Sequence, residues 1–191
     1  MATHPDYEVL RRRIEACGNL GQSFRGHVYR CSALEYAVEH KLVSGEGSKI
    51  NGGRWNAPGS FRAVYTGQAP DTALKEAQAQ ARYYGLERYT IFPLFFVALN
   101  VSLHNVLDLT LGSLRQHLIV SQRRMLKTDW RSEQDNGREA LTQAIGRAVF
   151  SAGFEGLLAP SVADPSGKIL VFFPVKLKKS STIQYILTRP S

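Results

Sequence analysis

Apolar residues recur along this chain with two different spacings, so the sequence predicts both helices and strands. Helical spacing is found over residues 7–17, 71–84, 111–118 and 133–150. Gly18 stands where the first helix would end, and Asp71 stands where an N-cap is expected in the second. The fourth helix is predicted to continue through Gly137 and Gly146.

Short apolar runs between glycine, proline and polar residues predict strands. These runs cover residues 27–31, 63–65, 90–101, 156–158, 169–173 and 183–187. The run 90–101 is almost continuously apolar and is predicted to be a buried strand, with Pro93 near its start, where a missing donor is tolerable. Because strands come in clusters with helices between them, we expect a mixed α/β or α+β fold in a single domain over residues 1–191.

Residues 44–60 contain five glycines and are predicted to form a long functional loop. Its centre reads Gly-Gly-Arg-Trp-Asn, residues 52–56. Glycines let the main chain approach a ligand closely, and the planar guanidinium of Arg54 matches phosphate oxygens in bidentate fashion. Trp55 offers either a flat surface for stacking or a core side chain, and the sequence leaves both interpretations open.

Glu76 lies in the predicted helix 71–84, in which Ala73, Ala77, Ala81 and Tyr84 form the apolar stripe. It follows Ala73 by three residues, so it lies on or beside the packed face. Its carboxylate is therefore either solvated at the margin of the stripe or directed into a pocket.

Length and composition favour one domain that lacks a membrane span. The 191 residues are 43% hydrophobic, but no run of about 18 apolar residues occurs. The first residues lack the basic-then-apolar order of a signal peptide, so we expect a cytoplasmic protein. Cys17 and Cys31 show no metal-ligand spacing with the five histidines, and we interpret both as ordinary thiols and expect no metal.

The formal net charge of +8 raises the question of nucleic-acid binding. The basic residues, however, fall in separate groups at 11–13, 123–127 and 176–179, and no DNA-binding or RNA-binding motif accompanies them. We therefore expect no direct contact with nucleic acid. A solvated basic face is the first interpretation, and a surface for an acidic partner or a dianionic ligand is the alternative.

The order of these short motifs resembles the RES-domain family, which is named for an arginine, a glutamate and a serine. The motifs are Gly-Gly-Arg-Trp-Asn, Pro58-Gly59, Tyr65, Glu76 and the segment Gly-Leu-Leu-Ala-Pro-Ser that ends at Ser161. The resemblance is strongest over residues 24–173. It implies a fold like that of ADP-ribosyltransferases. It also implies an enzyme that degrades NAD⁺, in some members by phosphorolysis, or that transfers ADP-ribose to a protein.

The resemblance assigns four residues to catalysis. Arg54 would hold the pyrophosphate of NAD⁺ or an attacking phosphate, and Tyr65 would pack on the nicotinamide or ribose and donate from its hydroxyl. Glu76 would stabilise the oxocarbenium-like state that forms as nicotinamide leaves. Ser161 would hydrogen-bond a phosphate or the nicotinamide amide; its alternative interpretation is a turn serine that caps a backbone amide.

Further candidate NAD⁺-binding residues are less specific. Arg30 matches an early arginine of such proteins and is interpreted as a second anion ligand or as a salt-bridged surface residue. Lys49, Asn56 and Trp55 complete the candidate binding set.

The function expected from sequence is an NAD⁺-consuming toxin that cleaves the nicotinamide–ribose bond, with inorganic phosphate or water as acceptor. The alternatives are an ADP-ribosyltransferase that acts on a protein and a non-catalytic module that binds a nucleotide or phosphate. Family resemblance implies an Xre-like antitoxin on a separate chain. Self-association through the N-terminal helix or C-terminal tail is left open.

Overall fold

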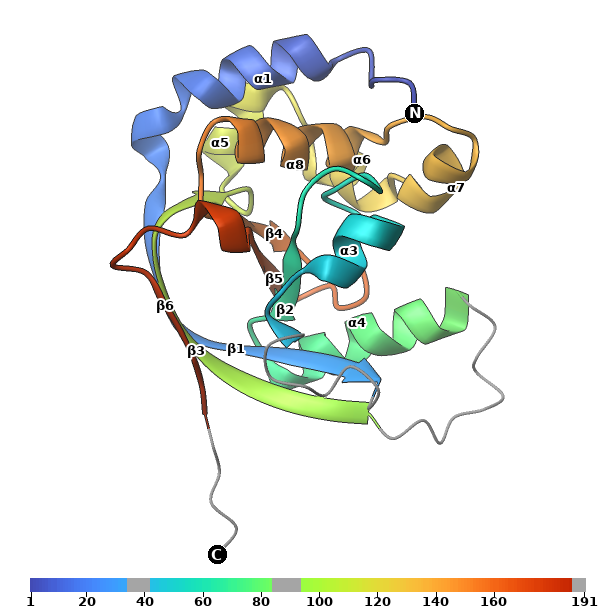
Figure 1. Cartoon of the computed structure of the whole chain (residues 1–191). Coiled ribbons are helices and arrows are strands. Elements are labelled where there is room, and N and C mark those ends of the chain that lie inside the picture. Colours follow the sequence, from blue (N-terminus) through green and yellow to red (C-terminus); the bar gives the residue numbers. More distant parts are fainter. Residues whose placement is uncertain (34–41, 84–93, 187–191) are drawn as a thin grey trace, which may run out of the picture.

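The structure, a computed structural model, describes residues 1–33, 42–83 and 94–186. Its strands are β1 (Gln22–Ala33), β2 (Val64–Gly67), β3 (Leu94–Asp108), β4 (Gly156–Pro160), β5 (Lys168–Phe172) and β6 (Thr182–Tyr185). Its helices are α1 (Tyr7–Ala16), α3 (Glu46–Asn51), α4 (Pro70–Tyr83), α5 (Gly112–Leu118), α6 (Gln122–Lys127), α7 (Trp130–Asp135) and α8 (Leu141–Ser151). Strands and helices are mixed along the chain (Figure 1), which confirms the α+β prediction.

The sheet folds back on itself. Its order is β1-β2-β5-β4-β3-β6, and β1 pairs in addition with β3, so five strands form a ring and β6 is added to β3. The β3–β4 pairing is parallel and the other pairings are antiparallel. Closure of this kind leaves few unpaired strand edges.

Alternation along the strands divides the interior into two hydrophobic clusters. In β5, Leu170 and Phe172 belong to a cluster whose members come from β1 to β5 and from Leu42. The intervening residues Ile169 and Val171 belong to the other cluster, which includes α1, α5 and α8. Successive side chains of a strand point to opposite faces, so one face of β5 looks into the ring of strands and the other towards the helices.

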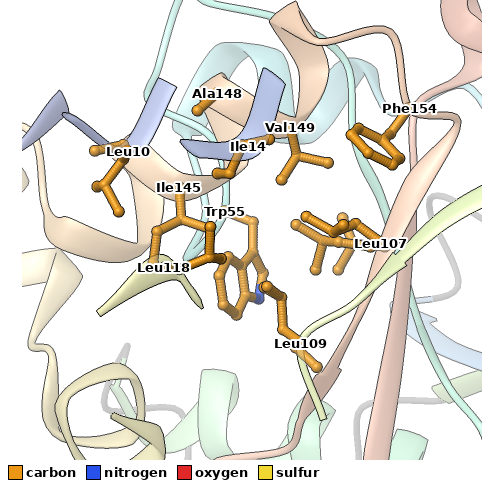
Figure 2. Packing of buried hydrophobic residues seen from close by; sticks show 14 of the residues in the cluster. Leu10, Ile14, Trp55, Leu107, Leu109, Leu118, Ile145, Ala148, Val149 and Phe154 are labelled. Carbon is orange, nitrogen blue, oxygen red and sulfur yellow. The ribbon is translucent and has the colours of Figure 1, made fainter. Parts of the chain in front are cut away.

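The helical layer holds Trp55. Figure 1 shows α1 and α8 together, well away from α4 at the other end of the molecule. Figure 2 shows the indole of Trp55 near Leu109, Leu118 and Ile145. The side chain is only 1% exposed, so a residue from the glycine-rich segment is fixed in the main core.

The predicted helix over residues 133–150 is wrong at its centre. The helix α7 ends at Asp135 and α8 begins at Leu141, because Gly137 has φ of 70° between them. That conformation is incompatible with a right-handed helix and is readily adopted by glycine. Gly146 lies within α8, as expected.

Three other predictions need correction. The loop predicted over residues 44–60 contains α3, and α6 was not expected. The helix α4 begins at Pro70, so Asp71 lies in its first turn and is not its N-cap. The strand β3 is not continuously buried: Leu99 and Val101 are buried while Asn100 between them is exposed.

The remaining predicted strands and the helices at residues 7–17 and 111–118 are confirmed, with boundaries shifted by a few residues and with β1 and β3 longer than expected. Tyr84, Leu187 and residues 90–93, which ended or began predicted elements, lie outside the described residues.

Glu155 ties three segments together from a fully buried position. Its carboxylate accepts from the amides of His104 (2.6 Å), Asn105 (2.8 Å) and Lys178 (2.8 Å), and from the hydroxyl of Ser181. Burial alone would raise the pKa of Glu155, but these donors stabilise the charged form and lower the pKa below its ordinary value of 4.5.

We expect Gly146→Ala to destabilise the fold although alanine is the better helix former. A Cβ at this position would lie 1.8 Å from the carbonyl oxygen of Trp55. Relief of that clash requires backbone movement and is expected to lower the free energy of unfolding by about 1–3 kcal/mol. The matched control is Gly47→Ala in α3, where a Cβ meets nothing within 4 Å. The control should be neutral or stabilising by up to about 1 kcal/mol. Urea denaturation of both variants tests this, and equal effects would contradict it.

We expect Glu155→Gln to lower the free energy of unfolding by about 2–4 kcal/mol at neutral pH, because it replaces charge-assisted hydrogen bonds in a buried site. Since the folded-state pKa of Glu155 is lowered, its contribution is complete above the ordinary value of 4.5 and is lost as the pH falls through the folded-state value. Denaturation at about pH 7 and about pH 3 should therefore show a difference between wild type and variant that shrinks in acid. A pH-independent difference would contradict this account.

Candidate active site

The segment that carries Arg54 is a tight turn. Gly53 and Asn56 pair with each other, the amide of Gly53 donating to the carbonyl of Asn56 at 2.8 Å. Asn56 is fully buried, and its side-chain amide donates to the carbonyls of Ser48 (2.7 Å) and Phe61 (3.2 Å). Arg54 and Trp55 therefore occupy the two central positions of a turn that is held at both ends.

Tyr65 of β2 holds this turn by two hydrogen bonds of its hydroxyl. Its hydroxyl donates to Oδ1 of Asn56 at 2.7 Å and accepts from the amide of Trp55 at 2.9 Å. Gly53 permits the approach, because a Cβ there would lie 2.5 Å from that hydroxyl. Burial raises the pKa of Tyr65, so the phenol is protonated at neutral pH.

The expected role of Tyr65 changes accordingly. From the sequence we expect this hydroxyl to donate to a ligand, but its single proton is directed to Oδ1 of Asn56. Tyr65 thus positions Arg54 through the turn. Packing of its ring against a ligand stays a prediction.

Arg54 is fixed by backbone acceptors that leave much of its charge uncompensated. Its Nη1 atom donates to the carbonyls of Met125 (3.0 Å) and Thr128 (3.1 Å), and it forms no ion pair within the described part of the chain. Burial lowers the pKa of Arg54, nearby Glu76 opposes this shift, and Arg131 adds to it. The guanidinium therefore lies within the electrostatic reach of Glu76 without being neutralised by it.

Glu76 and Ser161 meet directly, although 85 positions separate them in sequence. The Ser161 hydroxyl donates to Oε1 of Glu76 at 2.5 Å, and the amide of Ala163 approaches the same oxygen at 3.5 Å. Glu76 is half-buried, so it is not a fully solvated residue at the margin of α4. Ser161 is only 2% exposed, and its hydroxyl proton is donated to Glu76.

Arg30 approaches the same group of residues from β1. Its Nη1 atom donates to the backbone carbonyl of Tyr65 at 3.0 Å, and its Nε atom is buried with no acceptor. Burial lowers its pKa. Among residues 1–33, 42–83 and 94–186, no ion pair involves Arg30. Both interpretations of Arg30, an anion ligand and a salt-bridged residue, stay predictions.

The remaining candidates separate into core and surface. The burial of Trp55 decides for a core side chain against a stacking platform, because no face of its indole is open to a ligand. Asn56 is a buried structural residue that acts on the turn. Lys49 is a half-buried residue of α3, and its contact with a ligand stays a prediction.

Two cavities flank the predicted residues without including them. One of about 390 Å³ is lined by Thr72, Lys75, Asp164 and their neighbours, one residue along α4 from Glu76. The other, of about 710 Å³, lies between the N-terminal residues 2–5 and the region of α6 and α7. No cluster of metal-ligating side chains occurs in the described part of the chain, and no described helix is long and apolar enough to span a membrane.

Two residues around the candidate site, Arg131 and Asp164, were not predicted from the sequence. Arg131 influences Arg54 and lies over the rings of Tyr83 (4.3 Å) and Trp130 (4.4 Å). Its position depends on tertiary packing, and no sequence pattern marks it. Asp164 contacts the site through Ser161, and the spacing Ser-x-x-Asp after a predicted strand was a usable signal for a local turn.

The fold and the candidate site together define a class of protein. It is an α+β protein in which the partly desolvated Arg54 lies within the electrostatic reach of Glu76, whose carboxylate accepts a hydrogen bond from Ser161. A family model described as the RES domain matches residues 27–188, and the chain belongs to this family. NAD(+) phosphorylase MbcT of Mycobacterium tuberculosis (strain ATCC 25618 / H37Rv) is 27% identical over 157 residues, which are 81% of this chain and 76% of the relative. The protein of the same name from Mycobacterium bovis matches to the same extent.

Among solved structures, the crystal structure of the M. tuberculosis MbcT-MbcA toxin-antitoxin complex contains a chain with the same fold. The TM-score is 0.73 at 23% identity, and the superposition covers 94% of this chain and 90% of that chain.

We expect Tyr65→Phe to lower the free energy of unfolding by about 1–3 kcal/mol, because the amide of Trp55 and Oδ1 of Asn56 would lose their shared partner in a buried place. Tyr7→Phe is the control, since Tyr7 is buried in the hydrophobic cluster against which Tyr65 packs, and its hydroxyl makes no hydrogen bond to a described residue. The control should stay within about 0.5 kcal/mol of wild type. Urea denaturation compares the two variants, and equal stability would show that the Tyr65 hydroxyl does not hold the turn.

Proposed function

We propose that this protein is an NAD⁺-consuming toxin that cleaves the bond between nicotinamide and ribose and transfers ADP-ribose to inorganic phosphate. The observation that carries the proposal is the half-buried carboxylate of Glu76, held by Ser161 within the field of Arg54. Membership of the RES-domain family and the name of the mycobacterial relatives, NAD(+) phosphorylase, support it.

Departure of nicotinamide requires a negative group beside the ribose. As the C–N bond breaks, its electron pair leaves with nicotinamide and positive charge develops on the ribose. A preorganised carboxylate stabilises that charge, and Glu76 is the candidate. Ser161 fixes the direction of one carboxylate oxygen, while Oε2 of Glu76 has no hydrogen-bond partner among the residues described and is the oxygen we assign to the ribose.

Arg54 supplies the opposite charge. Among the described residues, the carbonyls of Met125 and Thr128 hold Nη1 of Arg54, and no hydrogen bond holds its other guanidinium donors. We assign these other donors to an anionic oxygen of the pyrophosphate or of the attacking phosphate. Phosphate oxygen then forms the new bond to the ribose carbon that nicotinamide left. The products are nicotinamide and phosphorylated ADP-ribose, and the bonds balance without a redox step.

Glu76 also argues against a module that only binds phosphate or a nucleotide. A carboxylate next to an anion site opposes anion binding, whereas a developing oxocarbenium ion is stabilised by it. The choice between phosphate, water and a protein side chain as acceptor is the finer part of the proposal. So is assignment to the ADP-ribosyltransferase superfamily.

We further propose that a separate antitoxin polypeptide of the Xre type restrains this protein in the cytoplasm. The solved complex with the same fold joins a toxin to an antitoxin, and this supports a partner on another chain. The net charge of +8 favours association with a more acidic partner. Self-association stays a prediction.

The test is release of nicotinamide from NAD⁺ by purified protein with and without phosphate. We expect Glu76→Gln to remain folded and to lower kcat by about 100- to 1,000-fold, because it keeps volume while removing the charge that stabilises the transition state. The control Glu8→Gln removes an exposed carboxylate of α1 and should leave turnover unchanged.

Each acceptor gives a different result. Release that depends on phosphate supports phosphorolysis, and release that does not depend on it assigns water as acceptor. ADP-ribose attached to a protein, with little free product, assigns a transferase. Near wild-type turnover of folded Glu76→Gln would refute the role of Glu76, and binding of NAD⁺ without any cleavage would leave a binding module.

A further inference from the structure

The loop that follows β4 is folded into a closed ring of hydrogen bonds. The amide of Ser161 donates to the carbonyl of Gly167 at 2.9 Å, and the amide of Gly167 donates to the carbonyl of Asp164 at 2.9 Å. Within the ring, the amide of Asp164 donates to the Ser161 hydroxyl at 3.0 Å. The serine that holds Glu76 is therefore itself held by the backbone of Asp164.

The side chain of Asp164 attaches this loop to α4. It is 5% exposed; Oδ2 accepts from the hydroxyl of Thr72 at 2.7 Å, and Oδ1 accepts from Nζ of Lys75 at 2.8 Å. Thr72, Lys75 and Glu76 lie at helical spacings of three and four residues, so they share one face of α4. That face contacts the loop through Asp164 and through Ser161.

The backbone contact also sets the direction of the Ser161 hydrogen bond. A hydroxyl has one proton to donate, and an amide N–H can only donate. Because the amide of Asp164 occupies an acceptor position on Oγ, the hydroxyl proton is free to go to Oε1 of Glu76. Consecutive hydrogen bonds of this kind polarise one another, so the donation to the carboxylate is strengthened.

Gly167 makes the compact loop sterically feasible. A Cβ at this position would lie 2.5 Å from Oδ2 of Asp164 and 2.5 Å from the hydroxyl of Thr72. The Thr72–Asp164 contact and any larger residue at 167 thus exclude each other. The loop, the buried aspartate and the helix face form one fitted unit.

We infer that Asp164 is a positioning residue for catalysis: it fixes Ser161 and, through Ser161, aims the carboxylate of Glu76. The inference rests on the proposed function for its kinetic consequences. Asp164 acts at a distance, since its carboxylate is already bound by Thr72 and Lys75 and is not offered to the substrate.

The kinetic experiment compares two substitutions at Thr72. Thr72→Val keeps the volume but removes the donor to Asp164, and we expect it to lower kcat for nicotinamide release by about 10- to 100-fold while KM for NAD⁺ stays within about threefold. Thr72→Ser keeps the hydroxyl and should recover most of kcat. Equal kcat values for the two variants would overturn the inference.

A double-mutant cycle tests whether Asp164 acts through Ser161. Asp164→Asn should lower kcat, but the double variant with Ser161→Ala should be no slower than Ser161→Ala alone, because both changes remove the same hold on Glu76. Multiplying effects would refute the route through Ser161. Asp71→Asn is the matched control, since Asp71 is an exposed carboxylate that lines the same 390 Å³ cavity. It should keep wild-type kcat.

Hydrogen exchange separates this inference from the proposed function. In Thr72→Val, exchange of the Asp164 amide should accelerate by about tenfold or more while the core amide of Val171 keeps its protection. Acceleration in a protein that shows no cleavage of NAD⁺ would refute the function and leave the positioning unit standing. An unchanged Asp164 amide would refute the inference whatever the activity.

Discussion

The arrangement of the candidate site depends on the burial of the Trp55 side chain. The indole lies in the main hydrophobic cluster and is 1% exposed, so the residues on either side of it are fixed in space. Full burial of an aromatic side chain contributes roughly 2–3 kcal/mol, which is more than one side-chain hydrogen bond on the surface provides. Gly146 in α8 makes room for the backbone of this residue, and Tyr65 binds its amide. The position of Arg54 is therefore set by its neighbour Trp55, whose side chain is buried in the core.

Glu76 is held in a different way, by polar contacts. The arginine is placed by packing of its neighbour into the core, whereas the glutamate is placed by a serine and a buried aspartate on a loop. Both solutions use glycine where two segments come too close for a Cβ, at Gly53 against Tyr65 and at Gly167 against Thr72. Substitutions in either support are therefore expected to move one of the two candidate residues, because Arg54 and Glu76 are held by separate contacts.

Much of the fold followed from local pattern, because strand alternation and helical periodicity are local properties. The break at Gly137 did not, since Gly137 and Gly146 look alike in sequence and only the first adopts positive φ. Tertiary contacts decide between the two. The short helices α3 and α6 were missed for another reason, because six residues carry too little periodicity to be distinguished from a loop.

The candidate residues were named from the sequence, but the contacts that hold them were not predicted. Arg54, Tyr65, Glu76 and Ser161 stood out through the order of short motifs, and the structure brings Glu76 to Ser161 and Tyr65 to the turn of Arg54. The partner of each hydroxyl depended on approaches across the fold, as with Tyr65 and Asn56. Asp164 was not predicted because a polar residue in a loop is usually solvated. Its structural role depends on its contacts with Thr72 and Lys75 of α4.

The pattern of charge around Arg54 and Glu76 bears on which ligand the candidate site would select. Arg54 lies within the electrostatic reach of Glu76, and the two side chains form no ion pair within the described part of the chain, so groups of opposite charge are held apart in a partly desolvated place. Such an arrangement is unfavourable in the empty protein and becomes favourable when a ligand supplies the complementary charges in the same order. NAD⁺ does so, with an anionic diphosphate at one end of a ribose and a cationic nicotinamide at the other. A phosphate ester without a cationic group would bind Arg54 but would offer no positive charge to the carboxylate of Glu76. Separation of the two charges by supports of different kinds therefore favours a ligand that is itself charge-separated. Under the proposed function, the carboxylate of Glu76 would then face the bond that breaks.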